Sequence, residues 1–374
     1  MFFRYAVKNN LIIIDIMTKY HPYTYETGKS IEVYKRTELF LNNNPDLKIK
    51  VEELGWVYYG MGNVIPQTTE NFWSGHFFPY TESWNELQIS FNLVLFGLYK
   101  QAFMSLRSGL ELGLLSVYYN INDDGHKAVQ DWLNSRDSWE ANTPRTDKIW
   151  NIMHSNDNIK NFDDKLKLRD HFNKLNFLHN YVHTKGYKYS NHLGIIKSNY
   201  QTFQEKLFLE WLNTYQEIVI IVTTLHLLKY PIGVIRFDWD KKVGIDNPFP
   251  VLREPEIEKL EKLLPQEYIV EIKKIAKRDR STQDLLTHIK ELPDMTEYDV
   301  EEQIISYDKM SIECHPGGFI GWEKDQKDLI EMLGYKEESK RKVLGKIKVL
   351  RKWAMENNFM KPRFKNIPSK EEDK

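Results

Sequence analysis

The stretch that most constrains the fold is residues 86–120, a long helix-compatible segment without proline. Apolar side chains fill most of its turns, so we expect a helix that is buried on more than one side. Arg107 and Glu111 interrupt this apolar surface one helical turn apart. A four-residue spacing permits an ion pair within the helix, and a buried charge is costly unless it is fully paired. The two residues are therefore either a structural ion pair or part of a functional site.

Ser105, Gly109 and Gly113 form a narrow stripe of small residues, spaced four apart, on the same predicted helix. Rows with this spacing are the grooves into which a neighbouring helix packs. Each glycine costs about 1 kcal/mol of helix stability relative to alanine. The stripe therefore predicts a close approach by another helix.

A second amphipathic helix is predicted at residues 163–183, with an apolar side and a polar side. The apolar stripe consists of Leu168, Phe172, Leu175, Leu178 and Val182. The polar side carries Arg169, Asn176, Asn180 and His183, with His179 at the border between the two. We expect this helix to pack against residues 86–120, so that their polar groups share one site.

The whole chain of 374 residues reads as mostly α, with helices also predicted at residues 30–42, 203–230 and 340–357. Residues 1–80 are expected to form an irregular aromatic N-terminal cap, because glycines, prolines and aromatic residues in 55–80 lack a helical period. That stretch is either a packed loop or the lining of a ligand pocket. Proline-rich residues 236–255 read as a linker. The predicted domains are the cap (1–80), a central helical bundle (81–245) and a smaller helical C-terminal domain (246–374).

Composition excludes several classes of protein. The formal net charge of −1 excludes a nucleic-acid-binding surface over the whole molecule, and Cys314 is the only cysteine, which excludes an intrachain disulfide. The most apolar stretch, residues 218–228, is about half the ~20 residues that a membrane span requires. We therefore expect no membrane span and a cytoplasmic location.

His179 and His183 have the four-residue spacing with which helical zinc proteases bind a metal. Asn180 stands where the catalytic glutamate of those proteases would follow, and no third ligand is evident. We predict no metal and no cofactor. Cys314 and His315 are neighbours in the chain, which does not orient a thiol toward a base.

The Arg107–Glu111 helix followed by the helix end Leu178-His179-Asn180-Tyr181-Val182-His183 resembles the HEPN-like helical bundles of abortive-infection and toxin proteins. The resemblance covers residues 81–235. It implies a metal-independent ribonuclease or an RNA-binding bundle, with RNA as partner and a homodimer in which two protomers act on one RNA backbone. The family's histidine, matched by His183 with Asn180 as its polar neighbour, would assist attack by the 2′-hydroxyl, and an arginine would hold the phosphate charge.

The chain departs from the family's nuclease signature, in which arginine, a polar residue and histidine lie within a few residues. Arg169 and Asp170 are too far from His179, so Arg107 would have to supply the guanidinium through space. The catalytic set is then Arg107, Glu111, Asn180 and His183. The alternative function is a non-catalytic helical interaction protein in which these groups only fix the core.

Basic residues crowd the last predicted helix, which is either a solvated face or a site of phosphate contact. The residues expected to contact nucleic acid are Arg169, Lys342, Lys346, Arg351 and Lys352. A short helix, a turn at Gly334 and a second helix are compatible with a helix-turn-helix, so a DNA-binding regulator is a further alternative.

Overall fold

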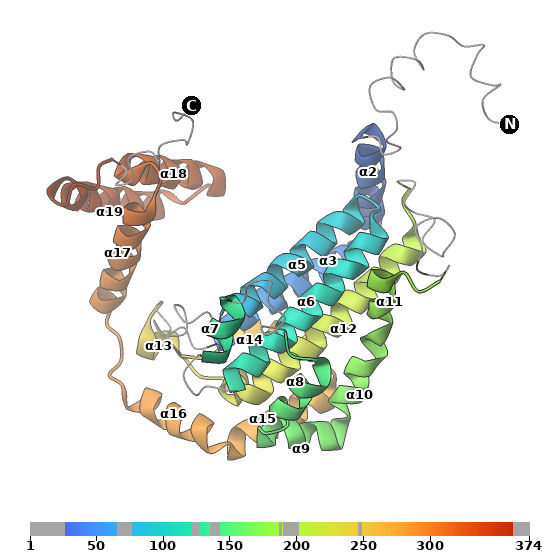
Figure 1. The fold of residues 1–374 in the computed structure, drawn as a ribbon. Coiled ribbons are helices and arrows are strands. Elements are labelled where there is room, and N and C mark those ends of the chain that lie inside the picture. The colour runs from blue at the N-terminus through green and yellow to red at the C-terminus, as the bar shows by residue number, and fades with distance from the viewer. Residues whose placement is uncertain are drawn as a thin grey trace, which may run out of the picture. The chain divides into compact units, whose positions relative to one another are not determined.

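Every regular element that the structure describes is a helix, as the apolar spacing predicts (Figure 1). The computed structural model describes residues 27–65, 77–121, 127–134, 143–186, 189, 202–245 and 249–361. Within these ranges there is no strand, and no helix is long and apolar enough to span a bilayer.

The helices follow one another along the chain. The first half contains α2 (Thr27–Asn43), α3 (Pro45–Gly60), η1 (Met61–Val64), α5 (Phe78–Leu95), α6 (Tyr99–Ile121), α7 (Lys127–Leu133), α8 (Thr146–Met153), α9 (Asp157–Leu166), α10 (Leu168–Asn173), η2 (Lys174–Phe177) and α11 (Leu178–His183). The second half contains α12 (Glu205–Lys229), η5 (Pro231–Val234), α13 (Asp240–Val243), α14 (Glu254–Leu263), α15 (Gln266–Arg278), α16 (Arg280–Glu291), α17 (Glu297–Cys314), α18 (Gly318–Leu333) and α19 (Glu337–Glu356).

The chain divides into two compact units that differ from the three predicted segments. The first is Met1–Phe237 with Pro248–Thr287, and the second is Asp238–Asn247 with His288–Lys374. Residues 248–287 belong with the bundle because Ile257, Leu260 and Ile272 are buried in its core. The segment 236–255 is not a plain linker, since Trp239 and Leu252 are buried within it.

The predicted continuous helix 86–120 is wrong, because the chain reverses at residues 96–98 and forms an antiparallel hairpin of α5 and α6 (Figure 1). Gly97 has a φ of +74°, which a side chain would strain. A Cβ there would also lie 3.0 Å from Val33 Cγ1 and 3.2 Å from the Thr202 carbonyl oxygen. Hydroxyls join the two helices: Ser90 Oγ donates to the Ala102 carbonyl (2.7 Å) and Ser83 Oγ to that of Gly109 (2.6 Å).

The described parts of the predicted irregular cap, residues 27–65 and 77–80, are also largely helical. Residues 55–60 complete α3, and residues 66–76 of the predicted loop lie outside the described part of the chain. Tyr58 and Tyr80 are buried and stack with ring centroids 5.2 Å apart. Packing against the bundle, rather than a helical period in 55–80, therefore orders these two tyrosines.

The small-residue stripe is tightly packed, as predicted. A Cβ on Gly109 would lie 2.9 Å from Leu87 Cδ2 of α5, and one on Gly113 would lie 2.7 Å from Val222 Cγ2 of α12. The same stripe therefore admits two neighbouring helices, α5 at Gly109 and α12 at Gly113.

Replacing Gly113 by alanine is expected to destabilise the fold by about 1–3 kcal/mol, because the methyl group overpacks a buried helix contact. The added Cβ would meet Val222 and, at 3.0 Å, the hydroxyl of Tyr58. Urea unfolding measures the change. Gly345→Ala in α19 is the matched control: nothing lies within 4 Å of its Cβ, so it should stabilise by up to about 1 kcal/mol. Equal effects at the two positions would contradict the close contact.

The second unit has a small core of its own, in which Ile312, Phe319, Trp322, Ile347 and Leu350 are buried. α17 begins at a capping pair: the Asp299 amide donates to Thr296 Oγ1, and Asp299 Oδ2 accepts from the Thr296 amide. The separated segment 238–247 is held by Lys242, whose Nζ lies 2.7 Å from Asp294 Oδ1.

Candidate functional site

The Arg107–Glu111 pair forms on α6 as the spacing predicts. Arg107 donates from Nε (3.0 Å) and Nη2 (2.9 Å) to a single oxygen, Glu111 Oε1. The Arg107 side chain is 18% exposed and that of Glu111 is 44% exposed. The pair thus lies at the surface of α6, partly buried and partly open to solvent.

The predicted helix 163–183 is broken into α9, α10, η2 and α11, with Lys167 in the left-handed region at a φ of 55°. The turn of 3-10 helix changes which side chains face inward at the end of the segment. Tyr181 is buried, whereas Val182 of the predicted apolar stripe is 39% exposed. The other four members of that stripe are buried as predicted.

α11 packs directly against α6. The rings of Phe103 and Tyr181 stack with centroids 4.6 Å apart and planes 3° from parallel. Buried Lys100 of α6 donates from Nζ to Thr184 Oγ1 (2.9 Å), immediately after α11 ends. These contacts fix α11 across the α6 surface that carries Arg107.

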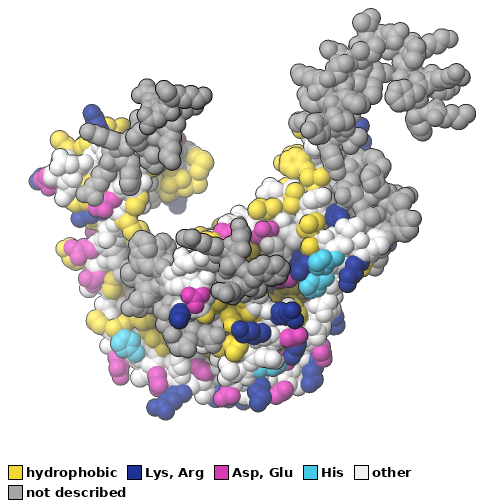
Figure 2. Space-filling view, viewed as in Figure 1, with side chains coloured by type: hydrophobic (Ala, Val, Ile, Leu, Met, Phe, Trp, Pro, Cys, Tyr) yellow, Lys and Arg dark blue, Asp and Glu magenta, His cyan; other side chains and the backbone are white. Residues whose placement is uncertain are grey.

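His179 is the residue that connects the two helices electrostatically. Burial lowers its pKa, and nearby Arg107, His183 and Lys185 lower it further, while Glu111 opposes them. His179 is half-buried and His183 is exposed. The imidazole of His179 is therefore neutral at neutral pH and able to accept a proton. Figure 2 shows histidine and basic side chains together at the surface in this region.

The structure thus places Arg107, Glu111 and His183 each near His179, with half-buried Asn180 on the same short helix as the two histidines. From helical spacing alone, His179 was predicted only at the border of the apolar stripe, and Lys100 was not predicted to take part in the site. The signal for Lys100 was present: it lies seven residues before Arg107, which is two helical turns on the same side.

Arg169 has other partners. Its Nη2 lies 3.3 Å from Asp147 Oδ1, and its guanidinium lies 6.0 Å from the centroid of the Trp150 ring. Its backbone amide donates to Asp163 Oδ1 (2.6 Å). None of these contacts involves α6 or α11.

The four basic residues predicted on α19 each lie near a carboxylate within the second unit. Lys346 Nζ is 2.5 Å from Asp308 Oδ2, and Arg351 pairs with Glu323. Lys342 and Lys352 form exposed pairs with Glu338 (3.7 Å) and Glu356 (3.9 Å). Exposed pairs of this kind are weak, so contact with nucleic acid stays a prediction for these residues.

A separate group that the sequence analysis missed surrounds His171. Its Nε2 pairs with Glu217 of α12, and its Nδ1 lies 3.3 Å from the Tyr268 hydroxyl of α15. His171 makes these contacts with α12 and α15 and is not part of the α6–α11 group. Among the described residues, no three or more His, Cys, Asp or Glu side chains are grouped to hold a metal ion.

The chain matches no family model, and neither a curated protein nor a solved structure is significantly similar to it.

Proposed function

We propose that the α6–α11 face acts on RNA, as a metal-independent ribonuclease or an RNA-binding surface of a bacterial defence or toxin-type protein. The observation that supports this proposal is the position of His179, whose pKa is lowered by burial and by nearby Arg107 and His183. A neutral imidazole beside a guanidinium and a second, exposed histidine is a combination suited to proton transfer at a phosphate.

In this proposal His183 accepts the proton of a 2′-hydroxyl, and Arg107 neutralises charge on the phosphate. A guanidinium has five N–H donors, and the bonds to Glu111 use two of them. Arg107 can therefore hold Glu111 and still donate to a phosphate oxygen. Glu111 orients the guanidinium, and Asn180 offers an amide next to the histidines. A second protomer would complete the site, as the HEPN-like resemblance implies, and the protein would act in the cytoplasm.

The deciding experiment incubates single-stranded RNA with the full chain in EDTA and follows cleavage on a denaturing gel. We expect wild-type protein to cut and His183→Ala to reduce the rate at least about a hundredfold, the scale of general acid–base catalysis. His288→Ala, a histidine on α16, is the matched control and should cut like the wild type. Equal products from wild type and His183→Ala, or none from either, would remove the nuclease proposal.

The full chain and its variants are also used to test RNA binding without cleavage. Arg107→Gln should weaken retention of RNA in a filter-binding assay at low salt, while Glu111→Gln should not. Unchanged binding by Arg107→Gln would exclude this face as the RNA surface.

The second candidate is a non-catalytic helical interaction protein, and one observation favours it: Arg107 already has a carboxylate partner in two hydrogen bonds. In that case Arg107→Gln changes stability but neither cleavage nor RNA retention.

A further inference from the structure

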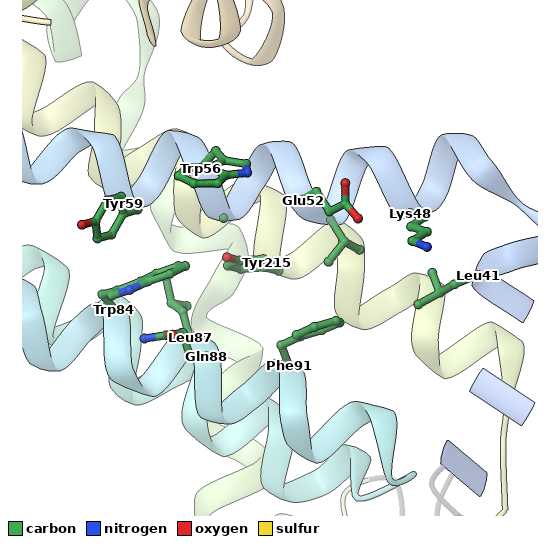
Figure 3. A pocket seen from close by; sticks show the side chains of 12 residues that line it. Leu41, Lys48, Glu52, Trp56, Tyr59, Trp84, Leu87, Gln88, Phe91 and Tyr215 are labelled. Carbon is green, nitrogen blue, oxygen red and sulfur yellow. The ribbon is translucent and has the colours of Figure 1, made fainter. Parts of the chain in front are cut away.

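A pocket with a volume of about 680 Å³ lies between α3, α5 and α12, and it shares no residue with the α6–α11 face. Its volume falls within the range of about 300–1,000 Å³ that is typical of small-molecule sites. Trp56 and Tyr59 reach it from α3, Trp84 and Phe91 from α5, and Tyr215 from α12 (Figure 3). Such sites are mostly apolar with a few polar groups that orient the ligand.

Aromatic side chains enclose one end of the pocket on three sides. Figure 3 shows Trp56 and Trp84 projecting from opposite sides, with Tyr59 at the end between them. Trp56 and Tyr59 are each 60% exposed, which is unusual for large aromatic residues in a helix that also contributes to the core. Lys259 Nζ lies 5.2 Å from the Trp56 ring centroid, so a cation–π contact holds this ring in place.

Tyr215 supplies a polar group at the back of the pocket. The residue is only 3% exposed and lines the pocket (Figure 3). Among the described residues its hydroxyl has no hydrogen-bond partner, although its ring stacks on Trp211 with centroids 5.4 Å apart. The hydroxyl oxygen is not sealed from solvent, so it is open to the pocket, and a ligand with a hydrogen-bonding group can take the place of water there.

Charge decides between classes of ligand. Lys48 and Glu52, of opposite sign, are the charged residues that line the pocket. A channel for single-stranded nucleic acid combines aromatic stacking with a strongly positive groove, which this pair does not provide. An uncharged ligand needs no such groove.

We propose that this pocket binds a small, uncharged, flat aromatic molecule, with its ring between Trp56 and Trp84 and its polar group hydrogen-bonded to Tyr215. The ring faces supply contact area, and the Tyr215 hydroxyl selects for molecules that can donate to it or accept from it. This is a second site, independent of the proposed action on RNA.

Two probes of nearly the same shape test the proposal on the full chain: 2-naphthol, which has a hydroxyl, and naphthalene, which has none. Saturation-transfer NMR gives their dissociation constants. We expect 2-naphthol to bind about fivefold more tightly than naphthalene, the factor that one neutral hydrogen bond contributes. Tyr215→Phe should bring 2-naphthol to the affinity of naphthalene and leave naphthalene unchanged.

A pocket-filling variant tests the location. A Cβ on Gly55 would lie 3.5 Å from Trp84 Cη2, an ordinary contact, so Gly55→Leu places its side chain in the pocket and should abolish binding of both probes. Gly345→Leu, on open α19 surface, is the matched control and should bind both. Circular dichroism checks that each variant is folded, and Tyr215→Phe carries the test if Gly55→Leu is not.

Three results would overturn the proposal: no binding of either probe to the wild type at millimolar concentration, equal binding by folded Gly55→Leu, or no change in 2-naphthol affinity in Tyr215→Phe. Displacement of 2-naphthol by a short single-stranded RNA, but not by uncharged aromatic competitors such as indole, would assign the pocket to nucleic acid instead.

Discussion

Replacing Trp211 by alanine is expected to cost about 3–5 kcal/mol of the free energy of unfolding, the range for removing a fully buried tryptophan. Trp211 on α12 has no exposed surface, and its ring packs on Phe91 of α5, with centroids 5.9 Å apart. Its Nε1 donates to Ser90 Oγ (2.8 Å), which in turn donates to the Ala102 carbonyl of α6. The substitution therefore leaves a cavity and also ends a hydrogen-bonded chain through three helices.

Urea unfolding of Trp211→Ala and Trp56→Ala measures how much unfolding free energy each substitution costs. Trp56→Ala is the matched control, because Trp56 is 60% exposed on α3 and loses only its contacts with Lys259 and the Tyr59 ring. We expect it to cost no more than about 1 kcal/mol. A loss at Trp211 as small as that at Trp56 would mean that α5, α6 and α12 are not packed as described.

Lowering the pH from 7.5 to 5 is expected to destabilise the fold through His226, which is 1% exposed on α12. The Val222 carbonyl (2.9 Å) can only accept, so His226 Nδ1 carries the proton and Nε2 accepts from the Ser116 hydroxyl (3.2 Å). Burial lowers the pKa of His226 from 6.5 to about 4, with the hydrogen bond to Val222 opposing this shift. The buried imidazole is therefore neutral in the folded protein.

The direction of the effect follows from these two pKa values. Between pH 6.5 and about 4 the unfolded chain binds a proton that the folded protein does not, so stability falls as the pH falls through this window. Above pH 6.5 the contribution is constant. The loss amounts to about 2 kcal/mol at pH 5 and approaches about 3 kcal/mol in the full window, since one pKa unit corresponds to about 1.4 kcal/mol.

Denaturant unfolding of the wild type and His226→Gln at pH 7.5 and 5 measures this contribution. The variant should be less stable at pH 7.5 but should lose about 2 kcal/mol less than the wild type on acidification. His179, whose pKa is also lowered, contributes in the same direction, and His288→Ala serves as a control that keeps the full dependence. The same acid loss in His226→Gln and wild type would show that His226 is not the group responsible.

Part of the candidate site could be predicted from residues close together in the chain. The four-residue spacing of Arg107 and Glu111 predicted their hydrogen-bonded pair, and the small-residue stripe predicted the close contacts at Gly109 and Gly113. Both depend only on helical geometry within α6. The position of His179 beside Arg107 could not be predicted in this way, because a turn of 3-10 helix before α11 changes the face that each residue presents.

The pocket shows the same limit. Most of its lining residues come from α3, α5 and α12. In the sequence, the aromatic stretch at 55–80 was compatible with either a packed loop or the lining of a ligand pocket. Only the packing of α12 behind the other two helices buries Tyr215 and directs it into that space.

The sequence by itself determined that this protein is helical and determined many of the side chains that its helices bury, because apolar spacing acts within a few turns of one helix. The tertiary structure decided where the chain reverses and which helices meet. The turn at Gly97 illustrates the difference: no proline marks it, and Val33 and Thr202, far away in the chain, leave room there only for a glycine. Contacts of this kind depend on distant segments, so local spacing cannot specify them.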